Sequence, residues 1–233
     1  MAQWNPRAGD GAGRLGARPG VPATPGSPGV HRLQLNGRRD GLLYVPAGHD
    51  ATRPAPLVVL LHGAGGSGAN ILPVLQPLAA QDDLLVLAPD SRDRTWDLLI
   101  DGYGPDVAFL DRALAWTFAR YAVDPACLAI GGFSDGASYA LSLGLDNGDL
   151  FAAILAFSPG FMAPERQVDA PRIFISHGTD DHVLPIARCS RRIVPQLQRA
   201  GYTVRYEEFP GPHTVPPHLA AAAVAWFLAP PDA

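Results

Sequence analysis

The strongest constraint on the fold is a short apolar run that ends in a serine flanked by glycines. Residues 128–131 (Leu-Ala-Ile-Gly) are typical of a buried strand, residues 132–136 are Gly-Phe-Ser-Asp-Gly, and small residues in a helical pattern follow. This order predicts a strand, a sharp turn and a helix, with the Ser134 hydroxyl held above the edge of a sheet. Gly132 and Gly136 are expected there because side chains would collide where strand and helix pack together.

The Gly-x-Ser-x-Gly pattern alone leaves two interpretations open. Ser134 is either a nucleophile on a strained turn or a residue that caps the helix after a glycine-rich turn. The chain has 25 glycines in 233 residues. A pattern this short therefore also arises by chance in such a sequence. The rest of the sequence has to decide between the two.

Length and charge narrow the class of protein. The 233 residues suit one α/β domain, and 47% of them are hydrophobic. A formal net charge of −4 gives no reason to expect a nucleic-acid partner or binding to a membrane surface. We find no run of membrane-spanning length and no signal peptide, so we expect a cytoplasmic protein. Cys127 and Cys189 lack the spacing of a redox or disulfide motif and are expected to be reduced.

Residues 1–29 are rich in proline and glycine and are expected to form a flexible segment ahead of a domain over residues 30–233. Strands are expected at residues 31–35, 41–46, 57–61, 84–88, 128–131, 152–157, 172–176 and 204–209. Helices are expected over residues 69–80, from Pro105, after Ser134, over residues 186–200 with a bend at Pro195, and over residues 218–228. This alternation predicts a mostly parallel sheet with helices on both faces, and no insertion is long enough for a lid domain.

Three of the expected strands end in residues that can do chemistry. Ser134 follows one strand, residues 177–183 (His-Gly-Thr-Asp-Asp-His-Val) follow a second, and His213 follows a third. The carboxyl ends of parallel strands meet at one edge of a sheet, where active sites of open α/β sheets lie. The chain order serine, aspartate, histidine is also the order of one known type of catalytic triad.

These residues resemble the α/β-hydrolase superfamily, and within it the serine esterases of the phospholipase/carboxylesterase group. The resemblance runs from about Gly41 to the C-terminus and rests on residues 61–65 (Leu-His-Gly-Ala-Gly), 132–136, 177–185 and His213. Residues 106–111 also resemble feruloyl esterases and polyester depolymerases. The resemblance implies an α/β-hydrolase catalytic domain over residues 30–233, with a mostly parallel sheet of about eight strands and no separate lid domain.

A serine hydroxyl is a weak nucleophile until a base takes its proton, so His213 is expected to act as the base towards Ser134. An aspartate on the other imidazole nitrogen would fix the tautomer and stabilise the imidazolium. Two neighbouring acids compete for this role. The family pattern H-G-x-x-D-x-V implies Asp181 as the triad acid, and it leaves Asp180 with a turn role.

An oxyanion hole needs backbone N–H donors at the place where the carbonyl oxygen gains charge. The resemblance implies Asp135, directly after the nucleophile, and Ala64, in the glycine-rich loop after the third strand. The histidines at 62 and 177 are expected to brace their turns. His182 is adjacent to the triad acid on an extended loop, so its side chain is expected to point away from it.

The side chains that would contact a substrate are less clearly marked. Trp96 and Tyr103 are candidates for the wall of an acyl or aromatic pocket, with loop anchoring as the alternative. Phe133 and Met162 are further candidates for the same pocket. Arg94 either meets a carboxylate on the substrate or is an ordinary solvated arginine.

The expected function is hydrolysis of small-molecule carboxylic esters with short or aromatic acyl groups, through an acyl-enzyme on Ser134. No organic cofactor is implied, and no metal, because no distant ligand joins residues 177, 180 and 181. We expect a monomer or weak homodimer, with no nucleic-acid or membrane partner. Cleavage of thioesters, polyesters or peptides by the same triad is the alternative. Another alternative is a non-catalytic binding protein on a hydrolase scaffold, in which the triad would be incomplete.

Overall fold

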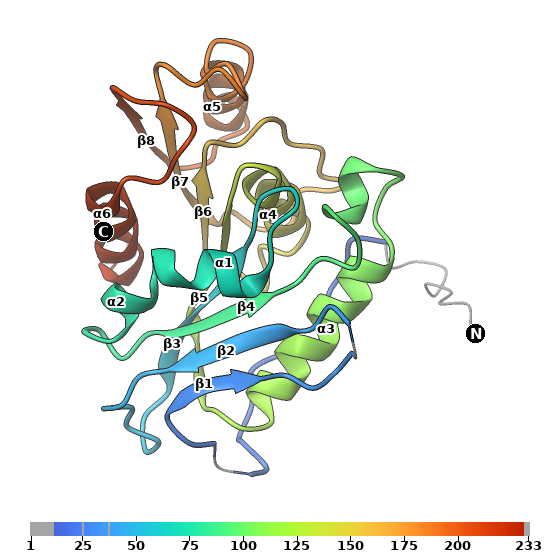
Figure 1. The fold of residues 1–233 in the computed structure, drawn as a ribbon, viewed down its shortest axis with the longest axis vertical. Helices are drawn as coiled ribbons and strands as arrows, with labels where there is room; N and C mark the ends of the chain where they lie inside the picture. The colour runs from blue at the N-terminus through green and yellow to red at the C-terminus, as the bar shows by residue number, and fades with distance from the viewer. Residues whose placement is uncertain (1–11, 25, 37, 231–233) are drawn as a thin grey trace.

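One twisted sheet organises the part of the chain that this computed structural model describes, which is residues 12–24, 26–36 and 38–230 (Figure 1). The sheet has eight strands in the order β1-β2-β4-β3-β5-β6-β7-β8. The strands are β1 (Gly29–Arg32), β2 (Gly41–Val45), β3 (Ala55–Leu61), β4 (Leu85–Pro89), β5 (Val123–Phe133), β6 (Ala153–Phe157), β7 (Arg172–Gly178) and β8 (Val204–Phe209). β2 pairs antiparallel with β1 and β4, and the other pairs are parallel. The expected mostly parallel sheet is confirmed.

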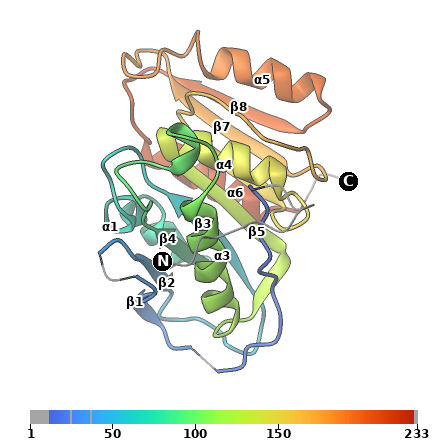
Figure 2. The same cartoon turned by 90° about the vertical axis from the view of Figure 1, so that its right-hand side faces the viewer.

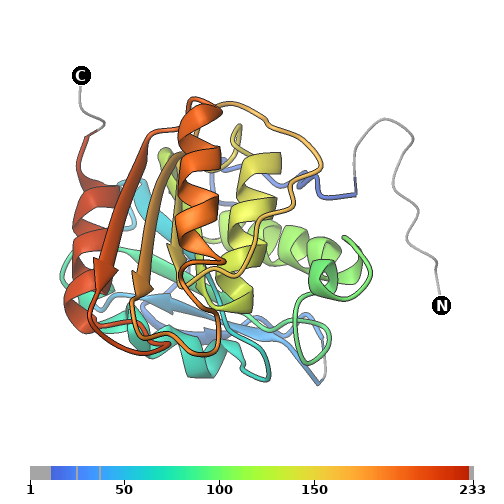
Figure 3. The ribbon, with the colours of Figure 1, turned by 90° about the horizontal axis from the view of Figure 1, so that it is seen from above.

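Helices cover both faces of the sheet, because its central strands are continuously apolar and expose neither face to water. The covering elements are α1 (Gly68–Ile71), η1 (Leu72–Val74), α2 (Gln76–Ala79), η2 (Asp97–Leu99), α3 (Pro105–Phe118), α4 (Asp135–Asp146), α5 (Ser190–Arg199) and α6 (Pro217–Leu228). α3, α4 and α5 pack on one face, which Figure 2 shows from the front. α1, α2 and α6 pack on the other, and Figure 3 shows α6 across the sheet from α5.

Three expected elements differ in detail, each for a local reason. The helix expected over residues 69–80 is broken into α1, η1 and α2, with prolines near the starts of the last two pieces. β1 ends before residue 33, because Gln34 has a positive φ of 56° and its N–H donates to the Asp40 carboxylate at 2.7 Å. α5 begins at Ser190 rather than residue 186, and Pro195 lies inside it as expected.

The N-terminal segment is packed against the domain from residue 12 onward, which corrects the expectation of a flexible segment for these residues. Leu15 is only 3% exposed, and its N–H donates to the Asn147 side chain at 2.9 Å. The next two residues both donate backbone hydrogen bonds to Asp111 in α3. Arg14 forms an ion pair with Asp149 at 2.8 Å. The expected flexibility of residues 1–11 lies outside the described residues.

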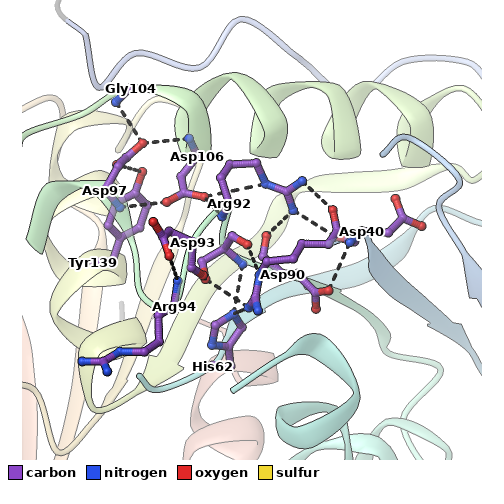
Figure 4. A network of polar contacts seen from close by, with 12 residues as sticks. Asp40, His62, Asp90, Arg92, Asp93, Arg94, Asp97, Gly104, Asp106 and Tyr139 are labelled. Carbon is purple, nitrogen blue, oxygen red and sulfur yellow. Dashed lines mark hydrogen bonds and ion pairs between the residues drawn. The ribbon is translucent and has the colours of Figure 1, made fainter. Parts of the chain in front are cut away.

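The loop between β4 and α3 is held by two carboxylates, the half-buried Asp97 and the buried Asp106 (Figure 4). Asp97 accepts hydrogen bonds from the backbone N–H groups of Gly104 at 2.9 Å and Asp106 at 2.7 Å, and from the Tyr139 hydroxyl at 3.0 Å. Asp106 accepts in turn from the backbone N–H groups of Arg92 at 2.5 Å and Asp97 at 2.8 Å. Each carboxylate therefore fixes the backbone of the other, and together they close the base of the loop.

Both carboxyl groups lie where charge is disfavoured. Burial, together with the negative charge of Asp97, raises the pKa of Asp106 to about 6. Burial also raises the pKa of Asp97. The Arg92 guanidinium opposes these effects, with its Nε atom 3.8 Å from Asp106. The loop is thus held in part by Asp106, whose protonation changes in mildly acidic solution.

We expect protein stability to depend on pH through Asp106. A carboxyl group whose pKa rises on folding stabilises the folded state at low pH. That contribution is lost as the pH rises from 3.8 through about 6. The Asp106→Asn variant lacks this titration. Urea unfolding should therefore give a difference in unfolding free energy, wild type minus variant, that is larger at pH 5 than at pH 8 by about 1 kcal/mol. Equal differences at the two pH values would contradict this account of the loop.

Candidate active site

Ser134 occupies a strained turn between β5 and α4. Its φ is 59° and its ψ is −120°, a conformation that is uncommon outside glycine, and its N–H donates to the Phe157 carbonyl at 2.9 Å. The glycines on either side are needed for the reason the sequence indicates. A Cβ on Gly132 would lie 2.5 Å from the Gly136 backbone, and a Cβ on Gly136 would lie 2.4 Å from the Leu61 carbonyl oxygen.

The side chains of Ser134, Asp181 and His213 come together beyond the ends of β5, β7 and β8. His213 Nε2 lies 2.8 Å from Ser134 Oγ, and His213 Nδ1 lies 2.5 Å from Asp181 Oδ2. Because a carboxylate only accepts hydrogen bonds, Nδ1 carries the proton and Nε2 accepts from the serine hydroxyl. This tautomer is the one in which the imidazole can take the serine proton.

The Asp181 carboxylate is fixed by its own loop. Its Oδ1 accepts from the backbone N–H groups of Val183 at 2.9 Å and Leu184 at 2.8 Å. Burial opposes ionisation, but the hydrogen bonds from Leu184 and His213 outweigh it and lower the pKa of Asp181. Asp181 is therefore ionised at neutral pH. Its neighbour Asp180 is exposed to solvent instead.

His177 supports the same carboxylate from behind. Its Nε2 lies 2.8 Å from the Leu184 carbonyl oxygen and 3.1 Å from Asp181 Oδ2. Since both partners are acceptors, Nε2 carries the proton, and Nδ1 accepts from the Ser190 hydroxyl at 2.7 Å. Burial lowers the pKa of His177, so the ring is neutral at neutral pH. The sequence indicates that His177 braces its turn but does not indicate its contact with Asp181. The signal that could reveal this contact is the four-residue spacing of the two residues within H-G-x-x-D.

The glycine-rich loop after β3 is held from two sides. His62 accepts from the backbone N–H of Ser91 at 3.0 Å through Nε2, while its Nδ1 lies 2.7 Å from the Gly63 carbonyl oxygen. The Gly65 N–H donates to the Arg94 carbonyl at 2.7 Å. His62 thus braces its turn, as expected, and the loop after β4 holds the loop after β3.

Ala64 and Asp135 occupy positions from which their backbone N–H groups can serve as donors. Ala64 lies between the two glycines of the loop after β3, and Asp135 is the first residue of α4. Neither N–H donates a hydrogen bond to any other part of the chain that the structure describes. The Asp135 carboxylate accepts from the Thr95 hydroxyl at 2.6 Å, which ties the start of α4 to the loop after β4.

Trp96 lies in the core, not on the wall of a pocket, which corrects that expectation and agrees with the loop-anchoring alternative. It has 0% exposure, and its ring lies between those of His62 at 4.9 Å and Tyr139 at 5.1 Å. Its Nε1 donates to the His62 carbonyl at 2.8 Å. Tyr103 lines a separate cavity of about 290 Å³ formed by residues 92–106. The lining of that cavity includes none of Ser134, Asp181 and His213.

Phe133 packs against His213, with its ring centroid 4.6 Å from that of the imidazole. Met162 is half-buried and packs against the core. Two apolar side chains that the sequence does not mark as candidates for substrate contact are strongly exposed on loops. Val183, two residues after the acid, is 67% exposed, and Ile100 in the loop after β4 is 61% exposed. Exposure of this kind on a loop cannot be inferred from apolar periodicity.

No helix in residues 12–24, 26–36 and 38–230 is long and apolar enough to span a bilayer. In that same part of the chain, no group of three or more His, Cys, Asp or Glu side chains is arranged to hold a metal ion. Cys127 and Cys189 are both free thiols.

Comparison with known proteins agrees with this geometry. Residues 113–224, which include Ser134, Asp181 and His213, match the family described as Phospholipase/Carboxylesterase. The chain is 30% identical over 165 residues to a probable feruloyl esterase C of Aspergillus niger. It is 29% identical over 161 residues to feruloyl esterase C of Emericella nidulans. These matches cover 67% and 66% of this chain but 59% and 58% of the relatives, so the chain spans about three fifths of their length.

Solved structures share the fold. Esterase PE8 has a TM-score of 0.66 and 29% identity, and the match covers 80% of this chain and 96% of PE8. A Bacillus cereus carboxylesterase has a TM-score of 0.63 at 20% identity, covering 84% of this chain and 96% of its own, and shows the fold alone. The chain therefore belongs to the α/β-hydrolase superfamily, and it is similar to the esterases of the phospholipase/carboxylesterase group.

Proposed function

We propose that the chain is a serine esterase that hydrolyses carboxylic esters with short or aromatic acyl groups. The observation that carries the proposal is the chain of hydrogen bonds from Ser134 through His213 to Asp181, at 2.8 and 2.5 Å. The similarity to carboxylesterases and feruloyl esterases supports the same reaction class. A non-catalytic protein on the same scaffold would be expected to have lost at least one of these contacts.

The proposed reaction has two halves. His213 takes the proton of Ser134 as the hydroxyl oxygen attacks the ester carbonyl, and Asp181 stabilises the imidazolium that forms. The backbone N–H groups of Ala64 and Asp135 stabilise the oxyanion. The intermediate then expels the alcohol, which receives the proton from His213, and an acyl-enzyme is left. Water deprotonated by the same histidine attacks the acyl-enzyme and releases the carboxylic acid.

The expected acyl preference follows from the lack of a cover. Residues 158–171, between β6 and β7, contain no helix or strand. The loop after β4 contributes only the three-residue η2 helix. Phe133 supplies apolar surface against His213, and the exposed Val183 lies on the loop that carries Asp181. Such a site favours short or flat acyl groups, since a long chain would find little wall to bury it. A cytoplasmic location, a small-molecule ester as the only partner class and a monomer or weak homodimer remain predictions.

The first prediction concerns the nucleophile. Ser134→Ala should reduce kcat by a factor on the order of 10⁴ or more, because only substrate binding and the oxyanion donors remain. Hydrolysis of p-nitrophenyl acetate and labelling by a fluorophosphonate probe would measure this, with circular dichroism as the control for folding. A folded variant that still takes up the probe would disprove the assignment.

The second prediction separates the two neighbouring acids. Asp181→Asn should lower kcat on the order of 10⁴-fold, because an amide in contact with Nδ1 favours the wrong imidazole tautomer. Asp180→Asn is the matched control and should lower kcat much less, since that side chain is exposed. Steady-state kinetics of both variants would check this. A reversal of the two losses would make Asp180 the acid.

The third prediction concerns acyl length. The value of kcat/KM for p-nitrophenyl esters should be highest between acetyl and roughly hexanoyl groups. Each buried methylene adds only about 0.8 kcal/mol, and only while there is a wall to contact. The rate should rise smoothly as the substrate concentration passes the solubility limit. A preference for palmitoyl over butanoyl esters, with a jump in rate at the interface, would instead indicate a lipase. A parallel panel of feruloyl esters, acyl thioesters and a polyester film would distinguish the alternative substrates.

A further inference from the structure

A positively charged cavity of about 530 Å³ lies beside the glycine-rich loop after β3. Its lining consists of Arg38, Arg39, Gly65, Arg92, Asp93 and Arg94, a formal charge of +3. We propose that this cavity, here called the arginine cavity, binds a carboxylate carried by the ester substrate. The preferred substrates are then esters that bear a negative charge away from the scissile bond. This inference rests on the proposed esterase function and specifies its substrate class.

Two of the four arginines are fixed by hydrogen bonds to uncharged groups. Arg39 donates to the Ser91 carbonyl at 2.5 Å and the Gly66 carbonyl at 2.8 Å. Arg92 donates to three backbone carbonyls, including that of Asp90 at 2.6 Å. Carbonyl oxygens orient a guanidinium but do not neutralise it. Asp106, 3.8 Å from Arg92 Nε, and Asp90 both act on Arg92 electrostatically, and Asp93 lines the same cavity. The lining still holds four guanidinium groups and one carboxylate, so the cavity keeps a net positive charge.

The other two arginines are exposed and available. Arg38 and Arg94 form no ion pair within the described residues, and no side-chain hydrogen bond of either is found there. Figure 4 shows the Arg94 side chain extending away from the polar network of the loop. A guanidinium pairs with a carboxylate through two parallel charge-assisted hydrogen bonds. These two side chains are thus free to close on a carboxylate that enters the cavity.

Two contacts of residues 94–95 connect the cavity to the proposed reacting centre. The Arg94 carbonyl accepts from the N–H of Gly65, the residue after Ala64. The hydroxyl of Thr95, the residue after Arg94, donates to the Asp135 side chain at 2.6 Å. The segment that carries Arg94 therefore contacts the neighbourhood of both proposed oxyanion donors. In the proposed binding mode, one small molecule places its ester carbonyl at those donors and its carboxylate in the arginine cavity.

The test compares substrates that differ in one charge. The first pair is 4-acetoxybenzoate and 4-acetoxybenzamide, with the charge on the alcohol side of the ester. The second pair is p-nitrophenyl hydrogen adipate and its terminal amide, with the charge on the acyl side. For each pair the measured quantity is the ratio of kcat/KM, anion over amide. The wild-type ratio should exceed one for at least one pair, and that pair identifies the side on which the carboxylate lies.

The variants are Arg94→Gln, the double variant Arg38→Gln/Arg94→Gln, and Arg53→Gln. Arg53 is exposed beside the amino end of β3, and its substitution removes the same charge at a position far from the cavity. The ratio should fall on the order of ten-fold in the double variant and stay at its wild-type value in Arg53→Gln. It should also fall in wild type when 0.5 M NaCl is added, because the two arginines are exposed to solvent.

The outcomes separate the two proposals. If the wild type hydrolyses the amides but its anion-over-amide ratio is at or below one for both pairs, the proposed carboxylate site is overturned. An equal ratio in wild type and in a folded double variant would also overturn it. If neither member of any pair is hydrolysed, the esterase function itself fails, and the substrate class falls with it. A ratio that falls in the double variant but not in Arg53→Gln supports the arginine cavity as the recognition site.

Discussion

The close approach of the β5–α4 turn to the end of β3 is the contact on which the rest of the site depends. A side chain on Gly136 would lie 2.4 Å from the Leu61 carbonyl oxygen, so no residue other than glycine fits without moving α4 or the end of β3. This contact brings Ser134 beside the glycine-rich loop. It also holds the serine in a strained conformation that the surrounding structure has to stabilise, at a cost of order 1–3 kcal/mol.

A second layer stabilises that arrangement, and it comes from the loop after β4. Trp96 fills the space behind His62, and Thr95 binds Asp135 at the start of α4. The base of this loop is closed by Asp97 and Asp106, which hold each other's backbone. Asp97 and Asp106 thus hold the loop whose Thr95 contacts the start of α4. The same loop carries the arginine proposed to recognise a substrate carboxylate, so positioning and recognition depend on one segment.

Most of the fold could be predicted from local pattern, because buried parallel strands are continuous apolar runs and helices have a distinct period. Some differences are local: the helix expected over residues 69–80 is broken into short pieces with prolines near the starts of two of them. Others are tertiary. Residues 12–24 look like a solvated tail in composition, yet Leu15 is buried and its backbone binds Asn147, a partner 132 residues away. No local signal reports such a partner.

The sequence by itself determined the fold class and the residues proposed for chemistry. Ser134, Asp181 and His213 each follow an apolar strand, and parallel strands end at a common edge. Only the tertiary structure decided what surrounds them. Trp96 was marked by its residue type as a candidate pocket wall, but its side chain is wholly buried behind the loop after β3. The arginine cavity draws on residues 38–39, 65 and 92–94, which no linear motif links. The direction of a loop side chain depends on packing against distant segments, and sequence periodicity carries no information about it.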